Sequence, residues 1–249
     1  MALWRRARSS GLQIGLIGLI GFIGFIGFIE LAAADAPVRL PPAGGEGWQP
    51  FTFRRIEKHT HYERVERDGD RWLRADSRCA ASARVTSLDG IDLARTPILH
   101  WRWRVDTPLE IPDERARQGD DFAARVYVMF RFEPERATLF ERLRHRLGSS
   151  TLGREPPGSA LSFVWTSREP PGTVWTNPYS DDTRMLALVR NELRRWRIES
   201  VDVPARYRAA FGREPPPLLA LGLMTDADDS CQRATAGYAD FRFTPREAR

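Results

Sequence analysis

The stretch RVYVMFRF at residues 125–132 places an apolar side chain at every second position. Side chains of a β-strand point to the two faces of a sheet in turn, so Val126, Val128, Phe130 and Phe132 share one face. The pattern predicts a strand with one face packed in a core and the other directed away from it.

The same two-residue period recurs along the chain. Residues 101–105 (WRWRV) alternate apolar with charged side chains, and the sequence DGD at residues 68–70 indicates a hairpin turn. Many short strands separated by Gly- and Pro-containing turns are typical of packed antiparallel sheets. We therefore predict an all-β, mostly antiparallel fold, a jelly-roll-like β-sandwich with further strands at residues 161–166, 185–189, 196–203, 218–224 and 238–243.

Two segments have a helical period instead. Residues 137–147 (ATLFERLRHRL) place leucine and phenylalanine at helical spacing before Gly148, and residues 204–211 (PARYRAAF) begin at a proline and end before Gly212. Both lie between predicted strands, so they are expected to be short helical insertions and not the regularly alternating helices of a parallel α/β sheet.

The N-terminus has the features of a secretory signal peptide. Arginines in residues 5–8 precede the apolar run 12–29, and small residues at Ala32 and Ala34 fit the signal-peptidase pattern. We predict a signal peptide at residues 1–34, a periplasmic or secreted location, and no membrane span after cleavage. An uncleaved anchor is the alternative, because the run approaches spanning length and has glycine at every third position. In either case the domain lies outside the cytoplasm.

The exported part is predicted to form one domain. Residues 35–47 are rich in Pro and Gly and lack periodicity, which predicts a flexible linker, and residues 48–249 have the length of a single domain. The whole chain has a formal net charge of +5, which falls to about +3 without the three arginines and the one glutamate of residues 1–34. This charge, carried by scattered arginines, is too small to indicate a nucleic-acid partner. The sequence does not determine the oligomeric state.

The chain has two cysteines, Cys79 and Cys231, and both lie in the exported part. In an oxidising compartment such a pair predicts a disulfide, with two buried thiols as the alternative. The sequence contains no serine-hydrolase, zinc-protease or CxxC motif, so we assign no catalytic residue.

Two acidic segments are candidates for a binding site. Asp120 and Asp121 stand just before the strand that Arg125 begins, where acids can cap backbone N–H groups, pair with the arginine or bind Ca²⁺. Asp226, Asp228 and Asp229 follow a later strand, and acids in this arrangement are typical of a hard-cation site, although the glycine and glutamate of an EF-hand are missing. A structural Ca²⁺ is therefore the one cofactor considered.

Aromatic residues supply the third set of candidates, because eight tryptophans are many for this length. Trp175, Asn177 and Tyr179 combine flat rings with an amide that donates and accepts, as sugar binding requires. The strand tryptophans, by contrast, are expected in the core. Arg102 and Arg104 point away from them, either into solvent or toward an anion on the sheet.

The chain resembles the DUF3047 family of exported bacterial proteins of unestablished role. The matching stretches are LHWRWRVDTPL (99–109), QGDDFAARVYVMF (118–130), VWTNPYS (174–180), VPARYRAAFGREPP (203–216), LGLMTDADDS (221–230) and GYADFRF (237–243). The resemblance implies an exported single-domain protein and supplies no catalytic residues. The chain departs from the family pattern at residues 228–231, which read DDSC where DNTG is expected. A cysteine in place of a turn glycine favours the disulfide.

Three functions are compatible with these features. The first is a non-catalytic β-sandwich that binds a glycan or another cell-envelope component. The second is a polysaccharide-acting hydrolase or lyase with two of the carboxyl groups at residues 120, 121, 226 and 228 as acid and base. The third is a structural envelope protein. Export, aromatic content and the missing catalytic motifs favour the first.

Overall fold

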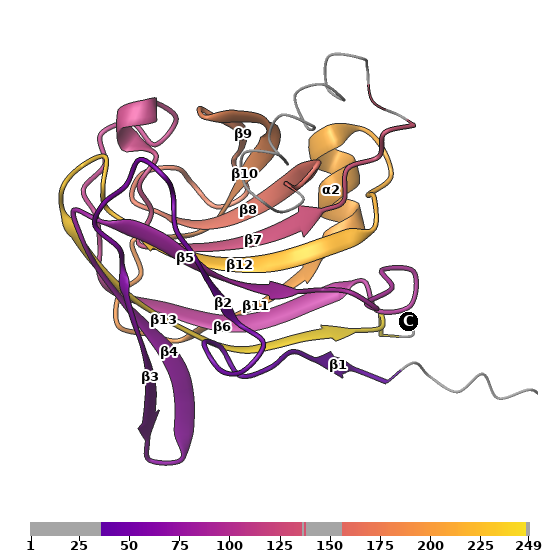
Figure 1. The fold of residues 1–249 in the computed structure, drawn as a ribbon, viewed down its shortest axis with the longest axis horizontal. Coiled ribbons are helices and arrows are strands. Elements are labelled where there is room, and N and C mark those ends of the chain that lie inside the picture. Colours follow the sequence, from indigo (N-terminus) through magenta and orange to yellow (C-terminus); the bar gives the residue numbers. More distant parts are fainter. Residues whose placement is uncertain (1–35, 136, 138–155, 248–249) are drawn as a thin grey trace, which may run out of the picture. The chain divides into compact units, whose positions relative to one another are not determined.

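A computed structural model describes residues 36–135, 137 and 156–247. Within them the chain forms two β-sheets that face each other as a sandwich (Figure 1). The first sheet has the order β11-β6-β13-β4-β3, and β1 also pairs with β13. Its strands are β1 (Val38–Arg39), β3 (His61–Arg67), β4 (Asp70–Arg78), β6 (Ile98–Thr107), β11 (Arg197–Asp202) and β13 (Arg233–Thr244).

The second sheet has the order β2-β5-β12-β7-β8-β10-β9. Its strands are β2 (Gln49–Phe51), β5 (Ala81–Ser87), β7 (Ala124–Phe130), β8 (Ser159–Thr166), β9 (Val174–Asn177), β10 (Ser180–Arg190) and β12 (Leu218–Asp226). Strands β8 and β10 pair in parallel, whereas the other strand pairs of the described residues are antiparallel. The prediction of a mostly antiparallel, two-sheet β fold is confirmed.

The two-residue period of the sequence matches the burial. Along β6 the exposed fraction alternates, and Trp101, Trp103 and Val105 are fully buried between the sheets. Phe163 of β8 packs on Trp101 with ring centroids 5.6 Å apart. Strand β8 departs from the alternation because all of its residues are buried, so both faces of the second sheet are covered along this strand.

One of the two predicted helices is observed. The segment 204–211 forms helix α2 (Val203–Phe211), where the Asp202 side chain accepts a hydrogen bond from the Ala205 N–H and Gly212 ends the helix with φ of 69°. The other predicted helix, at residues 137–147, falls almost entirely outside the described residues. A short 3-10 helix, η1 (Arg117–Gly119), was not predicted.

The start of the described chain differs from the prediction of a flexible linker at residues 35–47. Within this segment β1 pairs with β13, with Val38 opposite Phe243, and Ala43 is buried. Part of the predicted linker therefore belongs to the sandwich. The predicted signal peptide lies outside the described residues. Among the residues that are described, no helix is long and apolar enough to cross a bilayer.

We predict that Phe163→Ala lowers the free energy of unfolding by about 3–5 kcal/mol, because it removes a fully buried ring from the interface of the two sheets. Ile198→Ala is the matched control, since Ile198 is 73% exposed, and it should change stability by less than about 0.5 kcal/mol. Urea denaturation followed by tryptophan fluorescence measures both. Equal effects of the two substitutions would contradict the assignment of the core.

Candidate functional site

The acidic and aromatic candidates from distant parts of the sequence lie together at one end of the second sheet. Three segments meet there: the connection that precedes β7, the turn between β9 and β10, and the segment 226–232, which we call the acidic loop. Strand β12 ends in this loop at Asp226, whose N–H donates to the Phe122 carbonyl at 3.2 Å.

Arg125 is the centre of this arrangement, and its side chain is almost completely buried. Its Nε donates to Asp226 at 2.9 Å and its Nη1 donates to Asp120 at 3.2 Å and to the Tyr127 hydroxyl at 3.1 Å. The Phe122 ring lies 4.5 Å from the guanidinium carbon. Burial lowers the pKa of Arg125, but the charges of Asp120 and Asp226 outweigh it and raise the pKa well above its usual value. Arg125 therefore forms a buried, charged network.

Asn177 connects this network to the β9–β10 turn. Its Nδ2 donates to both carboxylate oxygens of Asp120, at 3.2 and 3.0 Å, and its Oδ1 accepts from the Tyr179 N–H at 2.9 Å. Asn177 is only 7% exposed, so its amide is already used within the protein. The sequence prediction that Asn177 contacts a ligand is not supported by this geometry.

Trp175 is also buried, with 8% of its surface exposed. It lies in a small apolar cluster with Phe122, Val164, Met185 and Ala187, and its ring centroid is 6.2 Å from that of Phe122. Phe122 and its neighbours occupy the space beside this ring, so the structure does not present it to a ligand. A role of Trp175 in sugar stacking stays a prediction that this packing does not support.

Tyr179 is the exposed aromatic residue of the site, with 55% of its surface accessible. Its hydroxyl lies 3.1 Å from an Asp229 carboxylate oxygen and 3.0 Å from the Arg117 carbonyl oxygen. The Arg117 guanidinium lies 5.4 Å from the ring centroid and donates to the Pro178 carbonyl at 3.0 Å. Burial and the neighbouring Asp229 raise the pKa of Tyr179 to about 12, so its hydroxyl stays protonated.

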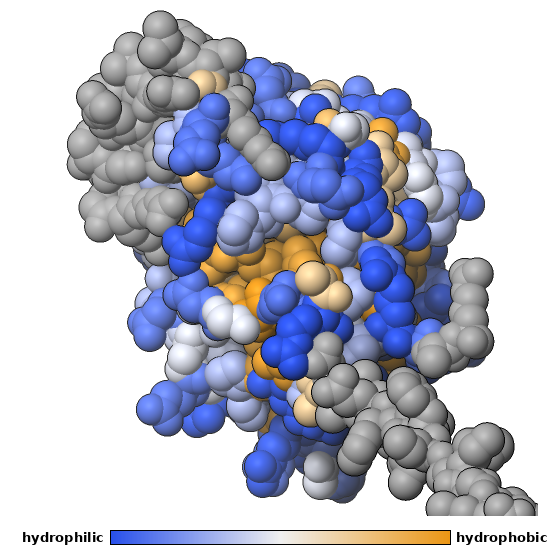
Figure 2. Space-filling view, turned by 90° about the vertical axis from the view of Figure 1, so that its right-hand side faces the viewer, coloured by the Kyte–Doolittle hydropathy of each residue, from blue (hydrophilic) through white to orange (hydrophobic). Residues whose placement is uncertain are grey.

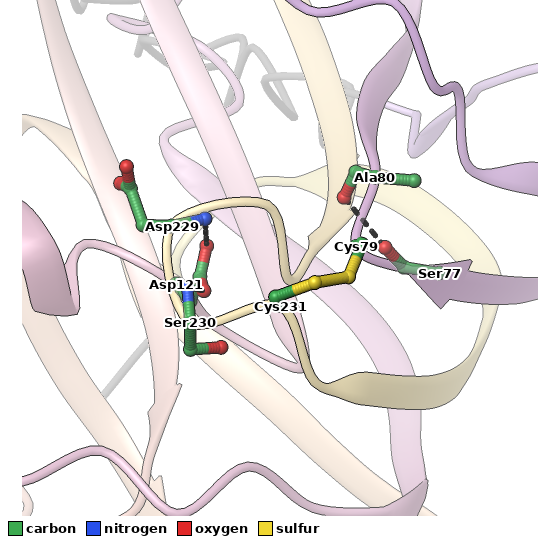
Figure 3. Close-up of a disulfide and its surroundings, with 7 residues drawn as sticks. All are labelled: Ser77, Cys79, Ala80, Asp121, Asp229, Ser230 and Cys231. Carbon is green, nitrogen blue, oxygen red and sulfur yellow. Dashed lines mark hydrogen bonds between the residues drawn. A yellow bond between two sulfur atoms is a disulfide. The ribbon is translucent and has the colours of Figure 1, made fainter.

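Asp121 holds the acidic loop through the backbone of the loop, whereas Tyr179 bonds to the side chain of Asp229. Its carboxylate accepts hydrogen bonds from the Asp229 N–H at 3.3 Å and from the Ser230 N–H at 2.6 Å (Figure 3). Asp121 is 1% exposed, so these two donors provide the hydrogen bonds that a buried carboxylate needs.

Asp121, Asp226 and Asp228 form a carboxylate cluster in which one oxygen of each lies within 4.8 Å of the others. Burial, with the charge of Asp121 added, raises the pKa of Asp228 to about 6. The set differs from the predicted one, because Asp229 lies outside the cluster and bonds to Tyr179, whereas Asp121 belongs to it. Oxygen ligands at this spacing suit a hard divalent cation such as Ca²⁺.

Cys79 and Cys231 form a disulfide, as predicted, and the alternative of two buried thiols is excluded. The bond joins the β4–β5 turn to the end of the acidic loop across a sequence separation of 152 residues (Figure 3). Cys231 has φ of 52°, the left-handed region that glycine favours, at the position where the family pattern leads one to expect glycine. Cys79 has φ of 47°.

The two arginines of β6 are not an anion site. Arg102 donates to Asp70 at 2.9 Å and pairs with Asp240, and its guanidinium lies 4.3 Å from the Trp196 ring centroid. Arg104 donates to Asp106 at 3.1 Å. Carboxylates already neutralise both side chains, so the alternative of an anion bound on this sheet face is not supported.

Two residues that position the site were not identified from the sequence. Glu114 is 2% exposed, and its carboxylate accepts backbone N–H bonds from residues 167–169, which fixes the segment before β7 to the β8–β9 turn. Arg117 provides the carbonyl and guanidinium contacts to the β9–β10 turn. Neither lies in a recognisable motif, because their partners are distant in sequence.

A groove of about 600 Å³ lies near α2, at the opposite end of β12 from the acidic loop. Aliphatic side chains and prolines line it, among them Ile91, Leu93 and Leu218, with Arg208 and Arg246 also in the lining. Figure 2 shows apolar surface in a hollow on the side of the molecule where α2 lies. The groove is separate from the acidic site.

Comparisons with known proteins give a family match and distant structural similarities. The family model described as "Protein of unknown function (DUF3047)" matches residues 46–242. A search of curated proteins gives no significant match.

Two of the similar solved structures are carbohydrate-binding modules of Clostridium thermocellum. The family 11 module, in complex with a β-1,3-1,4-mixed-linked tetrasaccharide, has a TM-score of 0.44 and 6% identity over 86% of this chain and 98% of that chain. The family 30 module of a cellulosomal cellulase has a TM-score of 0.44 and 11% identity over 86% and 99% of the two chains. Similarity this distant says nothing of what this chain binds.

We predict that Arg125→Met destabilises the domain by about 3–5 kcal/mol, because it leaves the buried Asp120 and Asp226 without their counter-charge. Arg71→Met is the control: Arg71 pairs with Glu66 at 3.0 Å on an exposed surface, and its loss should cost at most about 1 kcal/mol. Chemical denaturation measures both. A stable Arg125→Met variant would contradict the central role of this side chain.

Proposed function

We propose that this chain, which belongs to the DUF3047 family, is a non-catalytic binding domain that holds a glycan or another cell-envelope component at Tyr179 and the acidic loop. The observation that carries the proposal is the exposed Tyr179 ring, held in place through its hydroxyl by Asp229 and the Arg117 carbonyl. A fixed, exposed ring can stack on the apolar face of a sugar without losing much conformational entropy on binding.

The polar groups around this ring suit hydroxyl-rich ligands. Asp229 is exposed, and Asp228 is partly exposed next to it in the same loop. Carboxylates accept hydrogen bonds from sugar hydroxyls, and the nearby Arg117 guanidinium donates them. The same small area thus offers an aromatic face, acceptors and donors, which is the combination that glycan recognition needs.

The bonding of the carboxylates argues against the alternative of a polysaccharide-acting enzyme. Asp120 and Asp226 are buried and bonded to Arg125, and Asp121 is buried and bonded to two backbone N–H groups. A general acid or base must reach the glycosidic bond, with its partner carboxylate about 5–10 Å away across a cleft. These three groups instead stabilise the fold, which favours binding over catalysis.

We further propose that the cluster of Asp121, Asp226 and Asp228 binds Ca²⁺ and thereby fixes the acidic loop. Among the residues that the structure describes, the cation paired with this cluster is the Arg125 guanidinium, which Asp120 shares. Three carboxylates with their oxygens within 4.8 Å repel one another. Burial raises the pKa of Asp228, and the charge of Asp121 raises it further. A divalent cation would remove this repulsion and hold the loop beside Tyr179.

The proposed location is the periplasm or the exterior of the cell. A disulfide between Cys79 and Cys231 is typical of proteins that fold in an oxidising compartment. The features of residues 1–34 that predict a signal peptide support the same location, with a retained N-terminal anchor as the alternative. A purely structural role in the envelope has less support, because it does not explain why the exposed Tyr179 ring is held in place beside acidic side chains.

We predict that the domain binds at least one polysaccharide on an array of bacterial envelope glycans, and that Tyr179→Ala weakens this binding about tenfold or more. Tyr179→Phe should retain most of the affinity because it keeps the ring. Ile198→Ala, on the first sheet, should bind as the wild type does. Binding to no glycan, or binding that Tyr179→Ala leaves unchanged, would refute the proposal.

We predict that Ca²⁺ stabilises the metal-free domain and so raises its Tm. At a Ca²⁺ concentration a hundred times Kd, the free energy of unfolding should increase by about 2.7 kcal/mol. Asp228→Asn should abolish the rise while leaving the metal-free domain at least as stable, because it removes charge repulsion. Asp181→Asn, an exposed acid of β10, is the control and should keep the rise. The calcium proposal fails if wild type and Asp228→Asn respond alike in differential scanning calorimetry.

A further inference from the structure

We propose that the Cys79–Cys231 disulfide is an exchangeable clamp on the acidic loop, and that its reduction by a dithiol protein of the cell envelope releases the loop and weakens the site. The clamp itself follows from the bonding of the loop. Its consequence for ligand affinity rests on the function proposed above.

The disulfide is attached directly to the part of the loop that forms the site. Cys231 follows Asp229 and Ser230, the two residues whose N–H groups donate to Asp121 (Figure 3). On the other side, the Cys79 N–H donates to the Gln232 carbonyl at 2.9 Å. A displacement of Cys231 therefore moves Ser230 and Asp229, the two residues before it. Both bond to Asp121 of the carboxylate cluster, and Asp229 also bonds to the Tyr179 hydroxyl.

The backbone at both cysteines is held in a conformation that a side chain disfavours. Cys79 has φ of 47° and Cys231 has φ of 52°, where the Cβ atom crowds the following carbonyl. The covalent bond opposes relaxation at both positions. Once the bond is cut, either residue can turn to negative φ, and such a turn at Cys231 reorients the backbone that carries the Ser230 N–H.

The bond is accessible to exchange. Cys231 is exposed and Cys79 is partly exposed. A thiolate of the reducing protein attacks the Cys231 sulfur, and the Cys79 thiolate leaves and takes up a proton. The second thiol of the reductant then attacks the mixed disulfide and releases Cys231 as a thiol. In sum, two electrons and two protons pass to this chain, and the reductant is left with its own disulfide.

The sandwich does not depend on this bond for its strand pairing. The β4–β13 ladder begins beside the disulfide, with Arg78 opposite Arg233, and continues to Leu73 opposite Tyr238. The large apolar core is built from side chains of both sheets, and neither cysteine belongs to it. Reduction should therefore loosen the loop between β12 and β13 while both strands stay paired.

Amide hydrogen exchange of the oxidised and the reduced full-length chain tests the clamp without any ligand. We expect the Asp229 and Ser230 amides to exchange about tenfold faster after reduction, and the amides of β4 and β13 to change less than about twofold. The double variant Cys79→Ser/Cys231→Ser should show the fast exchange with or without reductant. Unchanged loop protection, or loss of protection throughout β12 and β13, would overturn the proposal.

Ca²⁺ titration of the same two redox states separates the clamp from the proposed function. A Kd at least about tenfold higher in the reduced chain supports redox control of the site. Equal Kd values in both states overturn that control. If neither state binds Ca²⁺ or any glycan while exchange still differs, the proposed function fails and the clamp stands.

Discussion

The buried guanidinium of Arg125 joins the parts of the chain on which the site is built. Arg125 lies near the start of β7, the central strand of the second sheet. It neutralises Asp120 from the preceding connection and Asp226 from the end of β12. A charge buried at this depth must be paired, so the position of the guanidinium fixes the positions of both carboxylates. Asn177, bonded to Asp120, extends this constraint to the β9–β10 turn.

This network separates residues that look alike in the sequence into two groups. The first group is internal: Asp120 and Asp226 are buried and bonded to Arg125, and Asn177 is buried and bonded to Asp120, so these side chains hold the site in shape and do not face a glycan. The second group faces outward, and consists of Tyr179 and the exposed part of the acidic loop. The proposed binding uses a surface that the buried group holds in shape. This arrangement is common in proteins, because a site gains affinity when its residues are fixed before the ligand arrives.

The acidic loop is restrained from three directions, and each restraint is chemically different. Two backbone N–H groups bond to Asp121, the Tyr179 hydroxyl bonds to Asp229, and the disulfide fixes the far end at Cys231. Opposing them is the repulsion among the carboxylates of the cluster. Burial, with the charge of Asp121 added, raises the pKa of Asp228 in this loop. The loop is thus the part of the domain in which we expect an added cation or a lost disulfide to have the largest structural effect.

The sequence by itself determined the β architecture of packed, mostly antiparallel sheets and helix α2, because alternation of apolar side chains and local capping signals are properties of neighbouring residues. It also singled out Asp120, Asp226 and Asn177 as candidates, but that they meet around Arg125 was decided by the tertiary structure. It could not show that β8 and β10 pair in parallel, or that residues 38–43 belong to the sandwich, since strand partners are chosen by the whole core. Nor could it distinguish Trp175, which is buried under Phe122, from Tyr179, which is exposed. That difference depends on the segment before β7, which places Phe122 against Trp175 and which Glu114 attaches to the N–H groups of residues 167–169, more than fifty residues away. Only tertiary structure decides such contacts, because the exposure of a side chain depends on what distant chain packs against it.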